Sequence, residues 1–158
     1  MELLAFGDTG WGDELFYATL MTIAVSITAM FIGFLFALIF TPLKLSKNKF
    51  LNFIANSYTT IIRGVPELLG IYLFFFGGTG AVMYVASIFG YNEYIEINAF
   101  ITGAFAIGII SGAYSTEVFR GAIQSIDKGQ FEAAKVLGLN KFEKFFKIIL
   151  PQTLRLAI

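Results

Sequence analysis

The stretch from Leu15 to Phe40 constrains the fold most, because none of its 26 residues carries a charge. As an α-helix it would be about 39 Å long at about 1.5 Å per residue, enough to cross a hydrocarbon core of about 30 Å with some tilt. The alternative is a helix buried in the core of a soluble protein. Few soluble helices of this length lack charges on every face, so the sequence predicts a membrane-spanning helix over 15–40.

Two further apolar regions predict two more crossings. The first crossing is expected from about 56 to 76 and is ended by the Gly-Gly-Thr-Gly run at 77–80. The apolar residues 81–89 are too few to span a bilayer, so we expect a re-entrant or interfacial segment there. The third crossing is expected from about 99 to 119, where Gly108 begins a GxxxG repeat that lets another helix approach closely.

The composition agrees with a membrane protein and excludes several classes of function. Only 14% of the residues are charged, whereas soluble domains carry about 25%. The net charge is zero, which gives no basis for nucleic-acid binding. The chain has no cysteine and no histidine, which excludes disulfides, metal sites built from those residues and histidine acid–base catalysis. We therefore expect no enzyme, no catalytic residue, no metal site and no cofactor on this chain.

The charged residues are sorted between the loops, and the sorting predicts an orientation. The loop after the first span has only basic charges, the loop after the second has only acidic ones, and basic residues return after the third. These residues are Lys44, Lys47 and Lys49, then Glu93 and Glu96, then Arg120, Lys128, Lys135, Lys141, Lys144, Lys147 and Arg155. The positive-inside rule then places the N-terminus outside and residues 120–151 in the cytoplasm.

Residues 120–151 contain the signals of a helical hairpin. Asp127 can cap one short helix, with Gln130 reaching back, and Asn140 can cap a second, with Glu143 completing a capping box. Gly138 stands where a left-handed residue would close the first helix. We therefore expect two short helices separated by one sharp turn.

The second of these helices is predicted to be amphipathic. Phe142, Phe145 and Phe146 fall at helical spacing, so their face can lie on the cytoplasmic surface of the membrane. Pro151 should end or kink the helix, because it has no N–H to donate. The apolar run 152–158 that follows is expected to begin a fourth span.

The hairpin also carries a spaced pattern: Glu-Ala-Ala, three residues, glycine, nine residues, then Ile-Ile-Leu-Pro at 148–151. This pattern resembles the EAA loop of ABC importer permeases, by which a membrane subunit grips its ATPase. The resemblance implies an ATPase-coupling role for six residues. They are Glu132, Ala133, Ala134, Gly138, Leu150 and Pro151. The alternative is a surface helix with an incidental Glu-Ala-Ala triplet.

Two segments upstream extend the resemblance. The runs Ala113–Gly121 (AYSTEVFRG) and Ile62–Glu67 (IRGVPE) look like the polar amino acid ABC permeases of the histidine, glutamine, arginine and octopine/nopaline type. The match covers about residues 15–158 and implies an all-α, polytopic membrane helical bundle of the type I importer class. Residues 1–158 would form one transmembrane domain with three spans, a cytoplasmic coupling hairpin and the start of a fourth span. Because the family has five core spans, the chain is expected to be incomplete at its C-terminus.

The charges near the second span suggest a substrate pathway. Pro66 lies between Arg63 and Glu67 and should kink or unwind the helix, because it lacks an N–H and clashes with the carbonyl four residues back. A broken helix exposes backbone groups that could meet a zwitterionic substrate. The candidate pathway residues are Arg63, Gly64, Pro66, Glu67, Tyr72, Tyr114 and Ser115. The alternative is a kinked span in which Arg63 only snorkels or packs.

Glu117 and Arg120 lie one turn apart at the inner end of the third span. Residues three apart on a helix face each other, so the two side chains can form an ion pair. We expect a structural pair that anchors the hairpin, in preference to a contact with substrate.

The resemblance implies the permease subunit of an ATP-driven, binding-protein-dependent importer of polar amino acids or opines in the bacterial inner (plasma) membrane. Its implied partners are a cytoplasmic ABC ATPase dimer, a second permease subunit, and a periplasmic or extracytoplasmic solute-binding protein. The chain has no G-x-x-x-x-G-K-[ST] loop, so ATP and Mg²⁺ are expected on the ATPase.

Three alternatives to this function stay open. One is an ABC permease for another small solute. Another is a secondary transporter or channel, which would need coupling carboxylates in the spans, where only Glu67 is credible. The last is a membrane scaffold fragment that does not itself transport.

Overall fold

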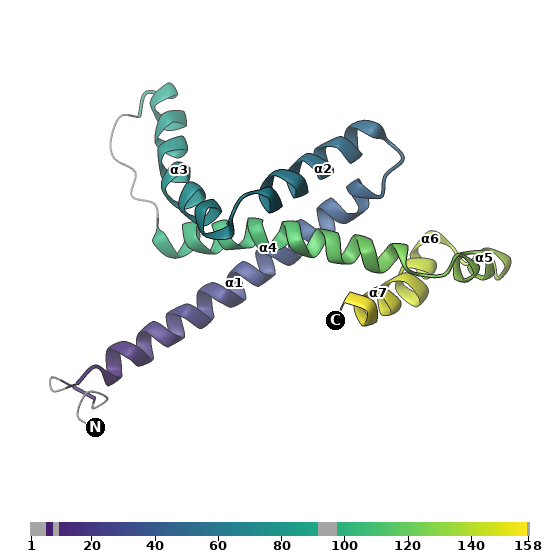
Figure 1. The fold of residues 1–158 in the computed structure, drawn as a ribbon, viewed down its shortest axis with the longest axis horizontal. Coiled ribbons are helices and arrows are strands. Elements are labelled where there is room, and N and C mark those ends of the chain that lie inside the picture. Colours follow the sequence, from purple (N-terminus) through teal and green to yellow (C-terminus); the bar gives the residue numbers. More distant parts are fainter. Residues whose placement is uncertain (1–5, 8–9, 92–97, 158) are drawn as a thin grey trace. The chain divides into compact units, whose positions relative to one another are not determined.

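The computed structural model describes residues 6–7, 10–91 and 98–157, and every regular element in these ranges is helical (Figure 1). Glu93 and Glu96, on which part of the predicted orientation depends, lie outside the described residues. The elements are α1 (Gly12–Lys44), α2 (Lys49–Gly64), α3 (Glu67–Ile88), α4 (Ala99–Gln124), α5 (Lys128–Val136), α6 (Lys141–Lys144), a π-helical turn (Phe145–Ile149) and α7 (Leu150–Ala157). Helices α1, α3 and α4 are long and apolar enough to cross a membrane, and α1 and α4 contain the predicted spans.

The second apolar region contains the break that was predicted at Pro66. The crossing expected over about 56–76 is divided there, because α2 ends at Gly64 and α3 begins at Glu67. Pro66 causes the break, because it cannot donate to the carbonyl four residues back and has an extended backbone, with φ −53° and ψ 131°.

The expected break at the glycines 77–80 is wrong, and so is the separate re-entrant segment over 81–89. Helix α3 runs through the Gly-Gly-Thr-Gly sequence and continues to Ile88. Glycine is a weak helix former in water. In a bilayer that weakness matters less, because a backbone group released from the helix would find no water to bond.

The described residues divide into two compact units. The first unit contains the described residues up to Gly33 and the residues Val65–Ser111. The second unit contains Phe34–Gly64 and the described residues from Gly112 onward. The units therefore share α1 and α4, each of which contributes one part to each unit.

The first unit is held together at glycines. A Cβ added to Gly108 of α4 would lie 2.6 Å from Ile32 Cγ2 and 3.1 Å from the carbonyl oxygen of Ala29, both on α1. A Cβ on Gly70 of α3 would lie 3.1 Å from Ile110 Cδ1. Helices α1 and α3 thus pack against α4 where a side chain is missing, as the GxxxG repeat predicts for Gly108.

The second unit is joined by aromatic contacts. The rings of Phe34 on α1 and Phe119 on α4 meet edge to face at 6.0 Å between centroids. Tyr58 of α2 lies 4.2 Å from Phe40 of α1, measured between ring centroids. These pairs connect the C-terminal half of α1 to α4 and to α2.

Large apolar side chains lie mostly on the outside. Phe31, Leu73 and Ile101 are 61%, 64% and 55% exposed, whereas the buried residues are mostly alanine and threonine. A soluble monomer rarely shows so continuous an apolar surface. Membrane helices, in contrast, pack through small residues and turn their large side chains to lipid.

Candidate functional site

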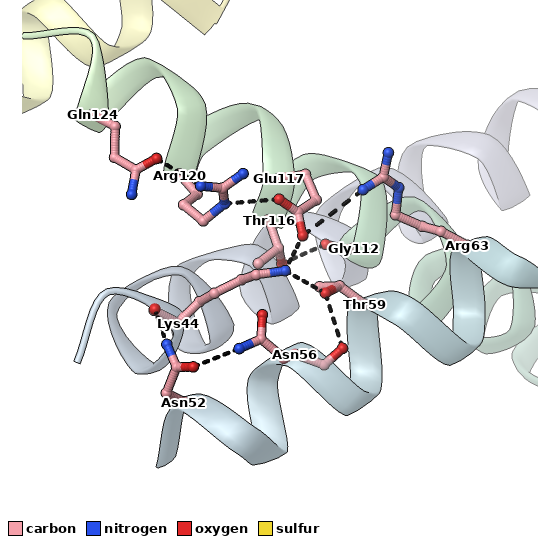
Figure 2. Close-up of polar contacts among 10 residues, drawn as sticks. All are labelled: Lys44, Asn52, Asn56, Thr59, Arg63, Gly112, Thr116, Glu117, Arg120 and Gln124. Atoms are coloured by element: carbon pink, nitrogen blue, oxygen red, sulfur yellow. Dashed lines mark hydrogen bonds and ion pairs between the residues drawn. The ribbon is translucent and has the colours of Figure 1, made fainter. Parts of the chain in front are cut away.

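A cluster of charged side chains from three helices meets at Glu117 of α4. Figure 2 shows Lys44 of α1, Arg63 of α2 and Arg120 of α4 converging on this carboxylate. Lys44 Nζ contacts Oε1, Arg120 Nε lies 2.8 Å from Oε2, and Arg63 Nη1 lies 3.8 Å from Oε1. We call these four residues the Glu117 cluster. It holds three cations and one anion, so its formal charge is +2.

Two members of the cluster are largely removed from solvent. The side chain of Lys44 is 10% exposed and that of Glu117 is 16% exposed. Burying an ammonium group is costly unless it is paired and hydrogen-bonded. Lys44 meets this requirement, because its Nζ donates to the Glu117 carboxylate and also, at 2.5 Å, to the hydroxyl of Thr59.

One face of α2 supports the cluster with a row of polar side chains. Asn52, Asn56, Thr59 and Arg63 are spaced four, three and four residues apart, which places them on one side of a helix. Asn52 donates to the carbonyl of Lys44, and Asn56 donates to Asn52 (Figure 2). The row therefore fixes both the backbone and the side chain at the end of α1.

The opposite face of α2 is apolar and points outward. Phe50, Phe53 and Ile61 are 69%, 68% and 64% exposed. An amphipathic helix on a soluble protein has the reverse arrangement, with its apolar face inward. Polar residues in membrane helices are turned toward the protein interior. The arrangement of α2 is therefore typical of a helix surrounded by lipid.

Arg63 is the least neutralised cation of the cluster. Both oxygens of Glu117 are already engaged, one by Lys44 and the other by Arg120. Arg63 reaches this carboxylate only at 3.8 Å, keeps 44% of its side chain exposed, and stacks its guanidinium 5.4 Å from the centroid of the Tyr114 ring. A guanidinium with free donors beside an aromatic ring is suited to bind a carboxylate.

The remaining predicted pathway residues are divided between the two units. Ser115 is half-buried on α4, in the same unit as Arg63 and Tyr114. Glu67 and Tyr72 belong to α3 in the other unit, and Tyr72 stacks on the ring of Phe76. Arg63 and Glu67 do not share a helix, because α2 ends at Gly64 and α3 begins at Glu67.

Sequence reasoning missed Lys44 and Thr59. Lys44 was read only as a charge that orients the first loop, because it is the first charged residue after the long uncharged stretch. The polar residues at 52, 56, 59 and 63 recur at helical spacing. That spacing could have indicated that one face of α2 contacts a buried polar group. The ion pair between Glu117 and Arg120 is present, and its anchoring role stays a prediction.

The hairpin after α4 has the predicted turn. Gly138 has φ +70°, which favours glycine, and the N–H groups of Gly138 and Leu139 bond to the carbonyls of Lys135 and Ala134. These two bonds form a Schellman motif that closes α5. At the start of α5, Asp127 accepts from the Gly129 N–H at 2.7 Å.

The second helix of the hairpin begins with the predicted capping box. Asn140 accepts from the Glu143 N–H at 2.9 Å, and Glu143 accepts from the Asn140 N–H at 3.0 Å. The Asn140 N–H and the ammonium of Lys147 hold the pKa of the Glu143 carboxyl below its ordinary value. Lys144 Nζ lies 5.0 Å from the centroid of the Phe131 ring, which links the two halves of the hairpin.

Pro151 lies inside the helical segment, as the second residue of α7. The preceding turn is π-helical, and the N–H of Leu150 bonds to the carbonyl of Phe145, five residues back. Such a widened turn often precedes a proline, because it relieves the clash with the ring. The helical segment therefore continues through Pro151 and does not end there.

The hairpin presents an exposed surface of mixed character. Glu132 and Ala133 are exposed, whereas Ala134 is fully buried. Around the turn, Val136 and Leu137 are 88% and 75% exposed. Phe142 and Phe146 also point outward from the second half. A surface that combines large apolar groups with single charges is typical of a protein-binding site.

The chain is similar to known transport proteins. Residues 29–158 match the family described as binding-protein-dependent transport system inner membrane component. The chain is 44% identical over 158 residues to the octopine transport system permease protein OccQ of Rhizobium meliloti, covering 100% of this chain and 67% of that protein. It is 42% identical over 159 residues to the nopaline permease protein NocQ of Agrobacterium fabrum, with coverages of 100% and 67%.

A solved structure agrees with these similarities. It is the crystal structure of an amino acid ABC transporter with histidines, which matches with a TM-score of 0.66 and 30% identity. The match covers 96% of this chain and 68% of that one. The chain thus spans about two thirds of the length of the relatives it matches.

Proposed function

This chain belongs to the family of binding-protein-dependent transport system inner membrane components, and we propose that it is the permease subunit of an ATP-driven importer of polar amino acids or opines. It is an integral inner membrane protein with three helices long enough to span. The observation that carries the proposal is its similarity, along the whole chain, to octopine and nopaline permeases.

The proposed assembly has three further parts. A cytoplasmic ATPase dimer would hold ATP and Mg²⁺, a second permease subunit would complete the pathway, and a periplasmic solute-binding protein would deliver the substrate. The N-terminus would lie outside and the hairpin in the cytoplasm, as the basic residues after α1 and α4 favour.

The hairpin is the proposed contact with the ATPase. Glu132 on α5 would pair with a basic group of the ATPase, and the exposed Val136, Leu137 and Phe142 would be covered by it. The Schellman motif at Gly138 and the capping box at Asn140 fix the ends of the two helices, which supports a role in transmitting a push.

The Glu117 cluster is the proposed route from the hairpin into the spans. A push on α5 would act on the C-terminal part of α4, which ends at Gln124 and in which Glu117 is bonded to Lys44 at the end of α1. Arg63 ties the end of α2 to the same carboxylate. The ends of three helices would therefore move together when the ATPase closes.

Arg63 is the proposed contact for the substrate within this unit. Amino acids and opines carry carboxylates, and a guanidinium binds a carboxylate through two parallel hydrogen bonds. Because Glu117 is already occupied by Lys44 and Arg120, Arg63 has donors left for this purpose. Tyr114 and Ser115 would contribute nearby polar groups.

The test uses the full-length protein expressed with its ATPase and binding protein. Glu132→Arg and Gly138→Asp should each abolish ATP-driven uptake, and Glu132→Arg should also abolish co-purification of the ATPase. Thr22→Val is the matched control, because its hydroxyl is exposed and bonded only within α1. Normal uptake by both hairpin variants, or uptake that needs no ATPase, would overturn the proposal.

A further inference from the structure

Lys44 and Arg63 approach the same oxygen of Glu117, and only one of them bonds to it. Lys44 Nζ donates to Oε1, whereas Arg63 Nη1 lies 3.8 Å from the same atom. Hydrogen bonds from nitrogen to oxygen are about 2.7–3.2 Å long, so Arg63 lies beyond bonding distance. The other oxygen, Oε2, accepts from Arg120 Nε at 2.8 Å. Lys44 and Arg63 are therefore competitors for one acceptor, and the structure shows it bonded to Lys44.

Contacts with α2 hold Lys44 in this position. Its Nζ also donates to the Thr59 hydroxyl at 2.5 Å, and that hydroxyl donates in turn to the carbonyl of Asn56 at 3.3 Å. Because the proton of Thr59 is directed at its own helix, the lone pairs of its oxygen are left for Lys44. Asn52 donates to the Lys44 carbonyl. Both the backbone and the ammonium group of Lys44 are therefore bonded to α2 (Figure 2).

The burial of the two cations differs in the same direction. The side chain of Lys44 is 10% exposed and that of Arg63 is 44% exposed. A buried ammonium group needs its counter-ion, because it has lost its contact with water. A partly exposed guanidinium is solvated and gains little from one more ion pair. Glu117 is thus bonded to the cation that would lose more without it.

Arg63 is held in place by a contact that leaves its N–H groups free for a carboxylate. Its Cζ lies 5.4 Å from the centroid of the Tyr114 ring. An aromatic ring attracts a cation through its electron-rich face and does not need the two parallel N–H groups that bind a carboxylate. Arg63 also follows Thr59 by four residues on α2, so the helix that bonds to Lys44 also positions Arg63.

We propose that Lys44 is a positioning residue for Arg63. By occupying Oε1 of Glu117, Lys44 prevents this carboxylate from bonding to Arg63, so the guanidinium stays available for a carboxylate of the solute. Glu117 is an internal competitor of the solute, because both carry the group that Arg63 binds. This inference rests on the proposed function, which makes Arg63 the contact for the solute.

The experiment measures how readily the Arg63 guanidinium reacts. The full-length permease with its partner subunits, in lipid nanodiscs, is treated with phenylglyoxal, which modifies arginine side chains, and the rate at Arg63 is followed by mass spectrometry. Lys44→Met keeps a long unbranched side chain but removes the cation from Oε1. Arg63 should then bond to that oxygen, and its modification rate should fall about three- to tenfold, between the effects of an exposed ion pair and of a charged hydrogen bond.

Two further variants show whether Glu117 causes this fall. Adding Glu117→Gln to Lys44→Met removes the negative charge that attracts Arg63, so the modification rate should return to that of the wild type. Lys47→Met is the matched control, because it removes an exposed lysine of the same loop that lies outside the Glu117 cluster. This control should leave the rate at Arg63 unchanged.

The direction of the change separates positioning from a purely structural role. If Lys44 only stabilised the helix ends, Lys44→Met would loosen them, and the modification rate at Arg63 would rise. A rise, an unchanged rate, or a fall that persists in the double variant would each overturn the proposal. A wild-type Arg63 that does not react would also overturn it, because its guanidinium would not be available.

The assay requires neither solute nor ATP, so it can fail separately from the proposed function. The expected pattern of modification, combined with normal uptake by Arg63→Gln, would overturn the contact of Arg63 with the solute and leave the competition for Oε1 established. Loss of uptake in Arg63→Gln, combined with an unchanged modification rate in Lys44→Met, would support that contact and overturn the role of Lys44.

Discussion

Replacing Glu117 with glutamine should destabilise the protein much more than replacing any single cation around it. The substitution preserves shape and an acceptor oxygen but removes the only negative charge of the Glu117 cluster. Lys44, whose side chain is 10% exposed, would then be a buried ammonium without a counter-ion. Removing one partner of a buried ion pair typically costs about 3–5 kcal/mol.

The two arginines add little to the loss of stability expected for Glu117→Gln, so the estimate stays near the low end of this range. Arg120 and Arg63 are 33% and 44% exposed, so water solvates them when Glu117 is lost, and each contact contributes about 0–1 kcal/mol. The remaining amide oxygen and the Thr59 hydroxyl still accept from Lys44. We therefore expect Glu117→Gln to lower the free energy of unfolding by about 3 kcal/mol, near the low end for a buried pair.

The assay is unfolding of the full-length protein in mixed detergent micelles with increasing dodecyl sulfate. Arg120→Gln is the matched control and should cost about 0–1 kcal/mol, because Glu117 still forms its ion pair with Lys44 in this variant. Adding Lys44→Met to Glu117→Gln should recover part of the loss, because it removes the unpaired buried charge. A loss below about 0.5 kcal/mol for Glu117→Gln, or a larger loss for Arg120→Gln, would refute the reasoning.

Three further predictions concern backbone packing and the hairpin. Gly108→Ala should cost about 1–3 kcal/mol in the same unfolding assay, because the new Cβ would lie 2.6 Å from Ile32 Cγ2, whereas Gly103→Ala meets no atom within 4 Å and should be neutral or slightly stabilising. Gly138→Val should cost about 1–2 kcal/mol, because φ is +70°, and it should speed proteolysis of the hairpin. Equal proteolysis rates would contradict this. Because the pKa of Glu143 is lowered in the folded protein, the stability that its capping box supplies is present above the unfolded value and is lost as the pH falls below it. The protection factors of the amides in the α6 turn, which correct for the slower intrinsic exchange in acid, should therefore fall below about pH 4.5 in the wild type and not in Glu143→Gln.

The sequence predicted those parts of the fold that follow from local chemistry or from the bilayer. The long uncharged stretch of α1 could form little else, because lipid offers no partner for free backbone groups. The Schellman motif at Gly138 and the capping box at Asn140 use residues within a few positions of one another, so they can be read directly from the sequence.

The prediction failed where two local preferences competed. A crossing was placed over about 56–76, with a break expected at Pro66 and an end at the glycines that follow. In the structure the break at Pro66 is present, but the glycines remain helical and α3 continues to Ile88. Glycine weakens a helix in water, where released backbone groups can bond to solvent. In lipid the backbone N–H and C=O groups must bond to each other, so the helix continues through the glycines.

The candidate site was predictable only in part. The contact between Glu117 and Arg120 spans three residues of one helix and was anticipated. The contact between Glu117 and Lys44 joins residues that are 73 positions apart, and no local pattern encodes it. It arises from the packing of α4 against the second half of α1, which a single sequence does not specify.

The polar-in, apolar-out arrangement of α2 has a consequence for engineering this protein. Its outward residues Phe50, Phe53 and Ile61 contribute contact with the surrounding medium and not with the charged cluster. Making these three positions hydrophilic would give a helix that is polar on both sides, and such a helix has no reason to stay among acyl chains. The same three positions can accept bulky apolar labels, because each of these side chains is more than 60% exposed among the described residues.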